Sequence, residues 1–431
     1  MFDRYEAGEQ AILVHVSFSD DEKKEDLDEL KLLVSSAGVE TLGIVTGPRK
    51  VPHARYFVGS GKAQEIADAV QTLCADVVIF NHSLSPAQQR NLEALCQCLV
   101  LDRTALILDI FAQRARTYEG KLQVELAQLR FMSTRLIRGW THLDKQKGGV
   151  GMRGPGETQL ESDRRLLSAR ITAIKGRLAK VAKQRDQGRR ARQRAEVPTV
   201  SLVGYTNAGK STLFNQITNA GVYAADQLFA TLDPTLRQIE IEDVGNCILA
   251  DTVGFVRHLP HDLVAAFKAT LQETREATLL LHIVDCSDEN YRDNIDAVQK
   301  VLIDIDAGEV PQLTIMNKID ALDDVVPHID VDDEGKPIRV WLSAQTGEGV
   351  ALLFEALTAH LSGKIRDLQL ILPPAQGKLR AAFYQLNCIE SERYAENGDC
   401  LLAIRINNVD LSRLRKQFDG ALEACLEIVT Q

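Results

Sequence analysis

The stretch that decides the fold is Val200-Ser201-Leu202-Val203-Gly204-Tyr205-Thr206-Asn207-Ala208-Gly209-Lys210-Ser211-Thr212. Its apolar start predicts a buried strand, its end opens a helical segment that continues to Thr218, and two glycines frame the loop between them. Such a loop turns its backbone N–H groups inward around an anion, and the following helix N-terminus adds positive potential. With Lys210 reaching the terminal phosphates and the Ser211 hydroxyl binding Mg2+, the pattern predicts a phosphate-binding loop in an α/β domain.

Two further motifs complete the phosphate and metal site. Asp251-Thr252-Val253-Gly254 closes the apolar stretch 246–250, so its carboxylate can hold Mg2+ through water and the Gly254 N–H can sense the γ-phosphate. Phe229-Ala230-Thr231-Leu232-Asp233 lies between the two motifs and is typical of switch I, where Thr231 offers the metal a second hydroxyl. We therefore expect Ser211 and Thr231 to bind Mg2+, and Lys210, Thr231 and Gly254 to act in catalysis.

A third motif, Asn317-Lys318-Ile319-Asp320, identifies the base. Its last carboxylate can accept from N1–H and from the exocyclic amine of guanine, a pair of donors that adenine lacks. Ser343-Ala344-Gln345 follows the strand-like stretch 338–342 and places the Ala344 N–H where it can donate to the guanine carbonyl. Gln345 stands where a lysine is more usual, but this contact is mostly made by backbone, so we expect little loss of affinity. The ordered motifs predict that all of their residues contact GTP.

The residue after the Asp251–Gly254 motif bears on the rate of hydrolysis. GTPases commonly place a glutamine there to orient the attacking water, whereas this chain has Phe255. An apolar ring cannot position water, so we expect slow hydrolysis unless a partner or another switch residue assists. Arg257, His258 and His261 are the nearby candidates, with a plain surface role in switch II as the alternative for both histidines.

Composition indicates a globular protein outside the membrane. The chain has 431 residues, 45% of them apolar, which suffices for about three domains with cores of their own. It has no apolar run of about 18 residues, and its first residues lack a signal-peptide pattern, so we expect a cytoplasmic protein with no membrane span. The eight cysteines form no CxxC pair, which favours reduced core thiols over disulfides or zinc ligands.

Charge is distributed unevenly. The net charge is −10, yet residues 164–194 hold twelve Lys and Arg side chains against one acid, Asp186. A solvated helix face normally mixes both signs for i,i+4 pairing, so an excess of one sign indicates a segment that binds a polyanion.

Residues 1–115 alternate between strand-like and helix-like patterns. Strands are predicted at 11–16, 41–45, 77–80 and 99–101, with helices at 22–35, 63–73 and 86–95, which together indicate a small α/β domain with a mostly parallel sheet. Gly59-Ser60-Gly61-Lys62 resembles a truncated phosphate loop without the following serine or threonine. A simple turn into a helix is the favoured interpretation, and a second nucleotide or RNA contact stays open.

Residues 116–196 predict an antiparallel helical hairpin. One apolar stripe runs through Leu122, Leu126, Leu129 and Leu136, and a second, with heptad spacing, runs through Leu160, Leu167, Ile171, Ile174, Leu178 and Val181. The glycine-rich tip 148–157 cannot be helical, and a backbone with few side chains beside arginines suits close packing against RNA. A flexible connection between the helices is the alternative.

The remaining chain is expected to form two units. Residues 197–365 make up the GTPase domain with its mainly parallel sheet, and residues 373–431 a small C-terminal α/β domain, with Pro373-Pro374 as the linker. We expect a monomer.

The tip residues carry a specific resemblance. Arg138-Gly139-Trp140-Thr141-His142-Leu143, Gly148-Gly149-Val150-Gly151 and Arg153-Gly154-Pro155-Gly156-Glu157-Thr158-Gln159-Leu160-Glu161, together with the loop at 204–211 and the switch at 229–235, resemble the HflX family of bacterial GTPases. The resemblance covers about residues 10–365. It implies binding to the 50S subunit and its 23S rRNA, insertion of the tip near the peptidyl-transferase region, splitting of idle or stalled 70S ribosomes under stress, and hydrolysis stimulated by the large subunit. For some members it also implies ATP binding at the N-terminal domain.

Two functions compete on the sequence. One is a ribosome-splitting factor whose basic hairpin docks on rRNA while the nucleotide gates affinity. The other is an assembly GTPase or an RNA-remodelling ATPase that acts on immature subunits or free RNA. A non-enzymatic RNA-binding module is a third class, which turnover of guanine nucleotide would exclude.

Overall fold

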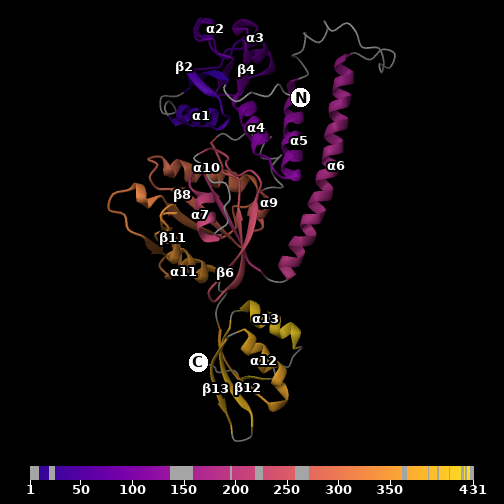
Figure 1. Cartoon of the computed structure of the whole chain (residues 1–431), viewed down its shortest axis with the longest axis vertical. Coiled ribbons are helices and arrows are strands. Elements are labelled where there is room, and N and C mark those ends of the chain that lie inside the picture. The colour runs from indigo at the N-terminus through magenta and orange to yellow at the C-terminus, as the bar shows by residue number, and fades with distance from the viewer. Residues whose placement is uncertain are drawn as a thin grey trace.

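Three β-sheets follow one another along the molecule, and a long helical hairpin lies beside the first two (Figure 1). This computed structural model describes residues 9–18, 25–135, 159–194, 197–218, 227–257, 271–361, 366–386, 388–395, 398–406, 408–418, 422 and 425–427. The glycine-rich tip and the residues expected to carry the HflX signature at 138–157 lie outside these ranges.

The N-terminal unit is a parallel sheet covered on both faces. Its strands are β1 (Gln10–Ser17), β2 (Glu40–Pro48), β3 (Val77–Phe80) and β4 (Leu99–Asp102), in the order β2-β1-β3-β4. Helices α2 (Ser60–Leu73) and α3 (Pro86–Cys96) share one core with the sheet, while α1 (Glu25–Ser36) and α4 (Arg103–Arg114) contribute to another. The predicted alternation and the parallel sheet are confirmed.

The hairpin consists of α5 (Tyr118–Arg135) and α6 (Gln159–Arg194). Leu122, Leu126 and Leu129 of α5 pack against Ile174 of α6, with Leu167, Ile171 and Leu178 at the margin of the same cluster. The two predicted apolar stripes therefore meet through these residues, as heptad spacing requires, whereas Leu136 of the first stripe lies outside the described residues and Val181 of the second is not part of the cluster. Most other described side chains of α6 are exposed, so the helix buries one stripe and turns its remaining surface to solvent.

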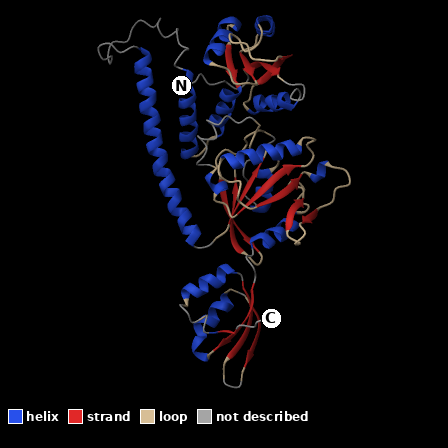
Figure 2. Cartoon of the chain, turned by 180° about the vertical axis from the view of Figure 1, so that it is seen from behind, coloured by secondary structure: helices blue, strands red, loops and turns tan. Residues whose placement is uncertain are grey.

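The central sheet has seven strands in the order β10-β11-β9-β8-β5-β7-β6. They are β5 (Thr199–Gly204), β6 (Thr235–Ile241), β7 (Gly245–Asp251), β8 (Leu279–Asp285), β9 (Gln312–Asn317), β10 (His328–Val331) and β11 (Pro337–Trp341), and only the edge strands β6 and β10 run antiparallel to their neighbours. Helices α7 (Lys210–Thr218) and α11 (Val350–Leu361) share one core with the sheet, and α10 (Tyr291–Asp304) packs in the other; α9 (Gln272–Arg275) is a single turn. Figure 2 shows these helices on both sides of the sheet.

The C-terminal unit begins earlier than predicted. Strand β12 (Arg366–Leu372) lies in the middle of an antiparallel sheet, in the order β13-β14-β12-β15, with β13 (Ile389–Tyr394), β14 (Cys400–Ile406) and β15 (Leu426–Glu427). Helices α12 (Gly377–Gln385) and α13 (Asn408–Gln417) complete a βαββαβ arrangement. The linker prediction at Pro373-Pro374 is wrong, because these prolines end β12 and open the short 3-10 helix η3 (Pro374–Gln376) inside the unit.

One apolar core joins the first and second units. Leu30 and Leu33 of α1, with Phe111 of α4 and Val124 of α5, belong to the same buried cluster as the switch residues Leu228, Phe229, Leu232, Val253 and Phe255. The N-terminal unit is thus packed directly on the segments that we expect to form switch I and switch II.

All eight cysteines are free thiols, and six of them are buried; the prediction of core thiols is wrong for Cys74, which is exposed, and for Cys98, which is half-buried. Among the described helices, none combines the length and apolar character needed to cross a bilayer.

Candidate nucleotide site

The phosphate loop leaves the end of β5 and enters α7. Gly204 has φ +151, and a Cβ there would lie 2.2 Å from the Ile283 carbonyl oxygen of β8. Gly209 has φ +92, and its missing Cβ would lie 2.2 Å from Asn317 Nδ2. Both glycines are therefore required by close contacts as well as by backbone conformation.

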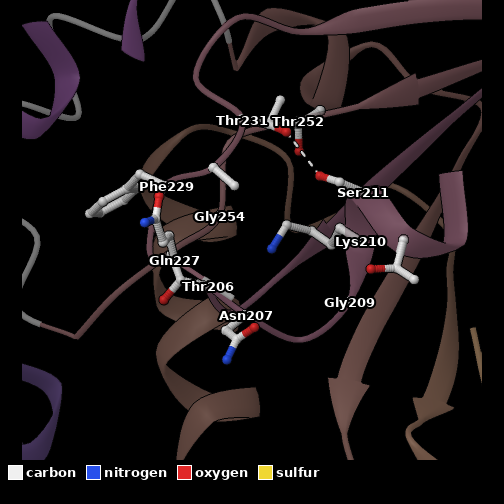
Figure 3. A pocket seen from close by; sticks show the side chains of 12 residues that line it. Thr206, Asn207, Gly209, Lys210, Ser211, Gln227, Phe229, Thr231, Thr252 and Gly254 are labelled. Atoms are coloured by element: carbon white, nitrogen blue, oxygen red, sulfur yellow. Dashed lines mark hydrogen bonds between the residues drawn. The ribbon is translucent and has the colours of Figure 1, made fainter. Parts of the chain in front are cut away.

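Lys210 is held inside this loop. Its side chain is buried, and Nζ donates to the carbonyl oxygens of Gly204 at 3.1 Å and Tyr205 at 2.6 Å. Burial lowers the pKa of Lys210 to about 8, against the opposing effect of the Asp251 carboxylate. Figure 3 shows its Nζ pointing into the pocket, toward Gly254.

Three oxygen-bearing side chains meet where the metal was predicted. Ser211 Oγ donates to Asp251 Oδ2 at 2.8 Å, Thr231 Oγ1 donates to the same oxygen at 3.0 Å, and the two hydroxyl oxygens are 2.9 Å apart. Asp251 is fully buried, and its Oδ1 has no hydrogen-bond partner among the described residues. Burial raises the pKa of Asp251, because it disfavours the charged carboxylate. A bound cation would stabilise that charge.

This donor set fits Mg2+. Two hydroxyls and one carboxylate are hard oxygen ligands, and Mg2+ typically completes its shell with water and substrate phosphates. When bound, the ion would neutralise charge on the phosphate oxygens. Ser211 and Thr231 would hold it, and Asp251 would orient its water ligands.

The base end of the site is braced by Asn317. Its Nδ2 donates to the Ala208 carbonyl at 2.8 Å, and its Oδ1 accepts from the Ala344 N–H at 2.9 Å, so one side chain ties the phosphate loop to the Ser343–Gln345 loop. The Ala344 N–H that we expected at the guanine carbonyl thus already donates to Asn317 Oδ1. A bound base would share this N–H donor with Asn317. Gln345 is exposed.

The three remaining residues of the base motif differ in their contacts. Lys318, at φ +69, forms an ion pair with Asp285 at 2.6 Å, and Ile319 is buried. Asp320 lies on the short helix η2 (Ile319–Ala321), is exposed, and makes no hydrogen bond or ion pair with any residue in the described part of the chain. Its carboxylate is available to a ligand.

The pocket itself collects residues of the phosphate loop and of both switches, and none of the base motifs at 317–320 and 343–345. It is lined by Thr206, Asn207, Gly209, Lys210, Ser211, Thr212, Gln227, Phe229, Ala230, Thr231, Thr252 and Gly254. Figure 3 shows Ser211 and Thr231 at one end and Gln227 and Thr206 at the other. Gln227 was missed from the sequence, because it precedes the recognisable part of switch I.

Four predicted contacts of the phosphate loop and switches point elsewhere. Leu232 and Val253 are buried in the core shared with the N-terminal unit, and Asp233 binds the start of α5. Tyr205 also faces the N-terminal unit, where its hydroxyl accepts from the Arg257 N–H at 3.0 Å. These residues support the switches from behind instead of lining the pocket.

Switch I is held by the N-terminal unit through both apolar and polar contacts. The Phe229 ring meets Phe111 of α4 edge to face, with centroids 4.7 Å apart. The Leu228 N–H donates to Ser36 Oγ at 2.9 Å, and Arg114 donates to both the Gln227 side chain and the Ser36 carbonyl. Such contacts favour one conformation of switch I.

Phe255 is buried, at 1% exposure, in that same core. Its backbone pairs with the phosphate loop, with N–H donating to the Gly204 carbonyl at 3.1 Å and C=O accepting from Thr206 N–H at 2.8 Å. The ring therefore fixes switch II against the N-terminal unit. Arg257, one candidate for assisting hydrolysis, bonds Asn294 of α10 at 3.1 Å and does not line the pocket; His258 and His261 lie outside the described residues.

Replacing Phe255 by glutamine should not restore a water-positioning side chain. The amide would enter an apolar core, so we expect Phe255→Gln to lower the free energy of unfolding by about 3 kcal/mol without raising GTP turnover. Urea unfolding and single-turnover hydrolysis measure both effects. Val326→Gln, at a position 71% exposed, is the control and should change neither. A faster turnover in Phe255→Gln would contradict this assignment.

The depressed pKa of Lys210 predicts proton uptake on binding. Above pH 8 the free lysine is increasingly neutral, whereas a bound phosphate stabilises the ammonium, so GDP binding should take up a proton and weaken as pH rises from 8 to 9.5. Calorimetric titration in buffers of different ionisation enthalpy measures the uptake. Guanosine, which lacks phosphates, is the control ligand and should bind without it; equal uptake for both would contradict the prediction.

The second glycine-lysine segment differs from the phosphate loop. Gly59 caps α2, and Lys62 in its first turn is partly exposed and pairs with Glu65 at 2.9 Å. The segment forms a turn into a helix, the interpretation favoured from sequence.

Comparison with known proteins agrees with this site. Family models match successive parts of the chain: "GTP-binding GTPase N-terminal" at residues 24–112, "GTP-binding GTPase Middle Region" at 114–192, "50S ribosome-binding GTPase" at 199–318 and "HflX C-terminal domain" at 331–424.

Individual relatives extend the match over nearly the whole chain. The GTPase HflX of Escherichia coli strain K12 is 66% identical over 417 residues, which cover 97% of this chain and 98% of the relative. The GTPase HflX of Magnetococcus marinus is 43% identical over 425 residues, 97% of each chain. A solved complex of SsGBP with GDP aligns at 23% identity and a TM-score of 0.47, covering 82% of this chain and 98% of that one.

Proposed function

Because the chain belongs to the HflX family of GTPases, we propose that it binds the 50S ribosomal subunit through its helical hairpin and splits idle or stalled 70S ribosomes, with GTP hydrolysis stimulated by the subunit. The observation that carries the proposal is the position of the basic helix α6. It packs along one side on α5 and stands beside the GTPase domain (Figure 1).

The charges of α6 support a polyanionic partner. Its apolar stripe packs on α5, which leaves Lys175, Arg177, Lys180 and Lys183 exposed. Arg170 and Arg185 pair with acids of α5, at 2.5 Å to Glu125 and 2.9 Å to Glu119, and so belong to the hairpin itself. The exposed cations fit the phosphate backbone of 23S rRNA, where Lys and Arg replace condensed counterions.

The nucleotide site supports a partner-dependent reaction. Lys210, the Thr231 hydroxyl and the Gly254 N–H surround the γ-phosphate position, which serves binding and charge stabilisation. Phe255 supplies nothing to the attacking water. We therefore propose that docking of the 50S subunit orders the site for hydrolysis, with Mg2+ at Ser211 and Thr231.

The deciding experiment compares GTP turnover with and without 50S subunits, beside a sucrose-gradient profile of 70S ribosomes. We expect strong stimulation by 50S and loss of the 70S peak with GTP or a non-hydrolysable analogue. Intact 70S particles together with binding to immature subunits would favour an assembly GTPase, and turnover indifferent to 50S would reject the proposal.

A charge-neutralised hairpin tests the surface. Replacing Lys175, Arg177, Lys180 and Lys183 by glutamine keeps helix propensity and should lower 50S affinity, with the salt dependence of binding falling by a slope of roughly 3. The matched control replaces four exposed cations elsewhere, Arg237, Lys300, Lys336 and Lys378, by glutamine. Equal loss in both variants would mean that net charge, not α6, determines binding.

A further inference from the structure

Asp233 of switch I is bonded to the start of the hairpin. Its Oδ2 accepts from the N–H groups of Arg116 and Thr117, both at 2.8 Å, and its Oδ1 accepts from the Thr117 hydroxyl at 2.6 Å. A carboxylate with three donors at the N-terminus of an 18-residue helix is favourably placed, because the first N–H groups of a helix have no partners within it.

The sequence of α5 is adapted to this contact. The Thr117 hydroxyl accepts from the Gly120 N–H at 2.9 Å while donating to Asp233, so it caps the helix and bonds the switch at once. Gly120 has an ordinary helical position, yet a Cβ there would lie 2.1 Å from Asp233 Oδ1. Glycine costs helix stability, and here its absent side chain admits the carboxylate.

The same carboxylate is two residues from the metal ligand Thr231. Leu232 between them is 2% exposed and packs in the core that includes Phe111 and Val124. Because Leu232 is packed in the core and its two neighbours are hydrogen-bonded, the backbone from Thr231 to Asp233 has little freedom to change conformation. A shift of Thr231 toward or away from Asp251 must therefore move Asp233 relative to α5.

The first turn of α5 also holds the second helix of the hairpin. Glu119 is buried, accepts from Gln123 at 3.0 Å, and pairs with Arg185 of α6 at 2.9 Å. The base of both hairpin helices therefore converges on the turn that Asp233 binds.

We propose that Asp233 is a positioning residue that ties Thr231 to the base of the hairpin, so that the γ-phosphate state of the nucleotide sets the order of the first turn of α5. With the γ-phosphate and metal bound, Thr231 is fixed and Asp233 caps the turn. With GDP bound, Thr231 is released and the cap loosens. The hairpin thereby senses the nucleotide through a contact within the chain, independently of what the hairpin binds.

Hydrogen exchange on the full-length protein tests this directly. We expect amides at 118–122 to exchange about tenfold more slowly with a non-hydrolysable GTP analogue and Mg2+ than with GDP, a difference that Asp233→Asn should abolish. Asp243→Asn makes the same change at an exposed turn between β6 and β7 and should keep the difference. No nucleotide dependence at 118–122 in the unaltered chain would overturn the proposal.

Variants on the α5 side separate positioning from loss of folding. Thr117→Val and Gly120→Ala should each reduce analogue affinity about tenfold but leave GDP affinity unchanged, because Lys210 and Asp320 are untouched. Thr117→Ser keeps the hydroxyl and should behave as the unaltered chain. A matching loss of GDP affinity in both Thr117→Val and Gly120→Ala, or unchanged analogue affinity in both, would overturn the proposal.

Discussion

Replacing Asp320 by asparagine is expected to reduce GTP affinity by about 10⁴-fold, among the largest effects of any single substitution in the chain. The carboxylate accepts two hydrogen bonds from guanine, at N1–H and at the exocyclic amine. An amide can accept only one of these and turns a donor toward the other, so a buried donor of the base loses its partner.

The same substitution should create affinity for xanthosine triphosphate. Xanthine keeps N1–H but carries a carbonyl in place of the exocyclic amine, so an asparagine can accept from N1–H and donate to that carbonyl. Fluorescent-nucleotide titration with GTP and with xanthosine triphosphate measures both constants. An unchanged preference for GTP would show that Asp320 does not contact the base.

Asp323→Asn is the matched control. It lies three residues further along, is exposed, and undergoes the same change in charge. We expect GTP affinity within about twofold of the unaltered chain, since one exposed charge has little effect at this distance in ordinary salt.

The parts of the site that could be predicted from the sequence are those governed by local backbone chemistry. The phosphate loop needs glycine at 204 and 209 because neighbouring atoms leave no room for a Cβ. Lys210 and Ser211 follow at fixed positions in the first helical turn, so their roles can be read from spacing alone. The parallel N-terminal sheet could be predicted in the same way, from the alternation of strand-like and helix-like patterns over residues 10–102.

The parts that could not be predicted depend on docking between distant segments. Asp233 lies in a nucleotide-binding motif, yet its partner Thr117 is 116 residues away and carries no motif of its own. Leu232 and Phe255 are apolar, which indicates burial but not against which surface. Gln227 enters the pocket only because Phe111 and Ser36 hold switch I in place.

The prediction of the C-terminal domain boundary was wrong for a different reason. Two consecutive prolines usually indicate a linker, because neither can donate to a sheet or continue a helix. Pro373 and Pro374 instead follow the last residue of β12, where no further ladder bond is needed, and open a 3-10 turn. The two prolines do interrupt regular secondary structure, as expected, but they do so inside the C-terminal unit and not between two domains.

Gly254→Ala is the second substitution for which we expect a large effect. A Cβ at this position would lie 2.8 Å from Thr206 Cγ2, 2.9 Å from Lys210 Nζ and 3.0 Å from Thr206 Cα. The phosphate loop and switch II cannot both keep their places, so the Gly254 N–H and the Lys210 ammonium move apart at the γ-phosphate position. A displacement near 1 Å at reacting groups costs about 10²-fold in rate, and we expect the maximal rate of GTP hydrolysis, with or without a stimulating partner, to fall by at least that factor.

Affinity for GDP separates this effect from a collapse of the site. GDP has no γ-phosphate, and the N–H groups around Gly209 that would hold its β-phosphate are not among the nearest contacts of the added methyl group, which are Thr206 and Lys210 Nζ. We expect GDP affinity in Gly254→Ala within about threefold of the unaltered chain, while the GTP analogue binds more weakly.

Gly245→Ala is not a suitable control variant, because Gly245 has φ +82 and an alanine there is strained. Gly377→Ala is the suitable control, since a Cβ at this first residue of α12 meets nothing within 4 Å. Normal turnover in Gly254→Ala would mean that switch II approaches the γ-phosphate through a residue other than Gly254.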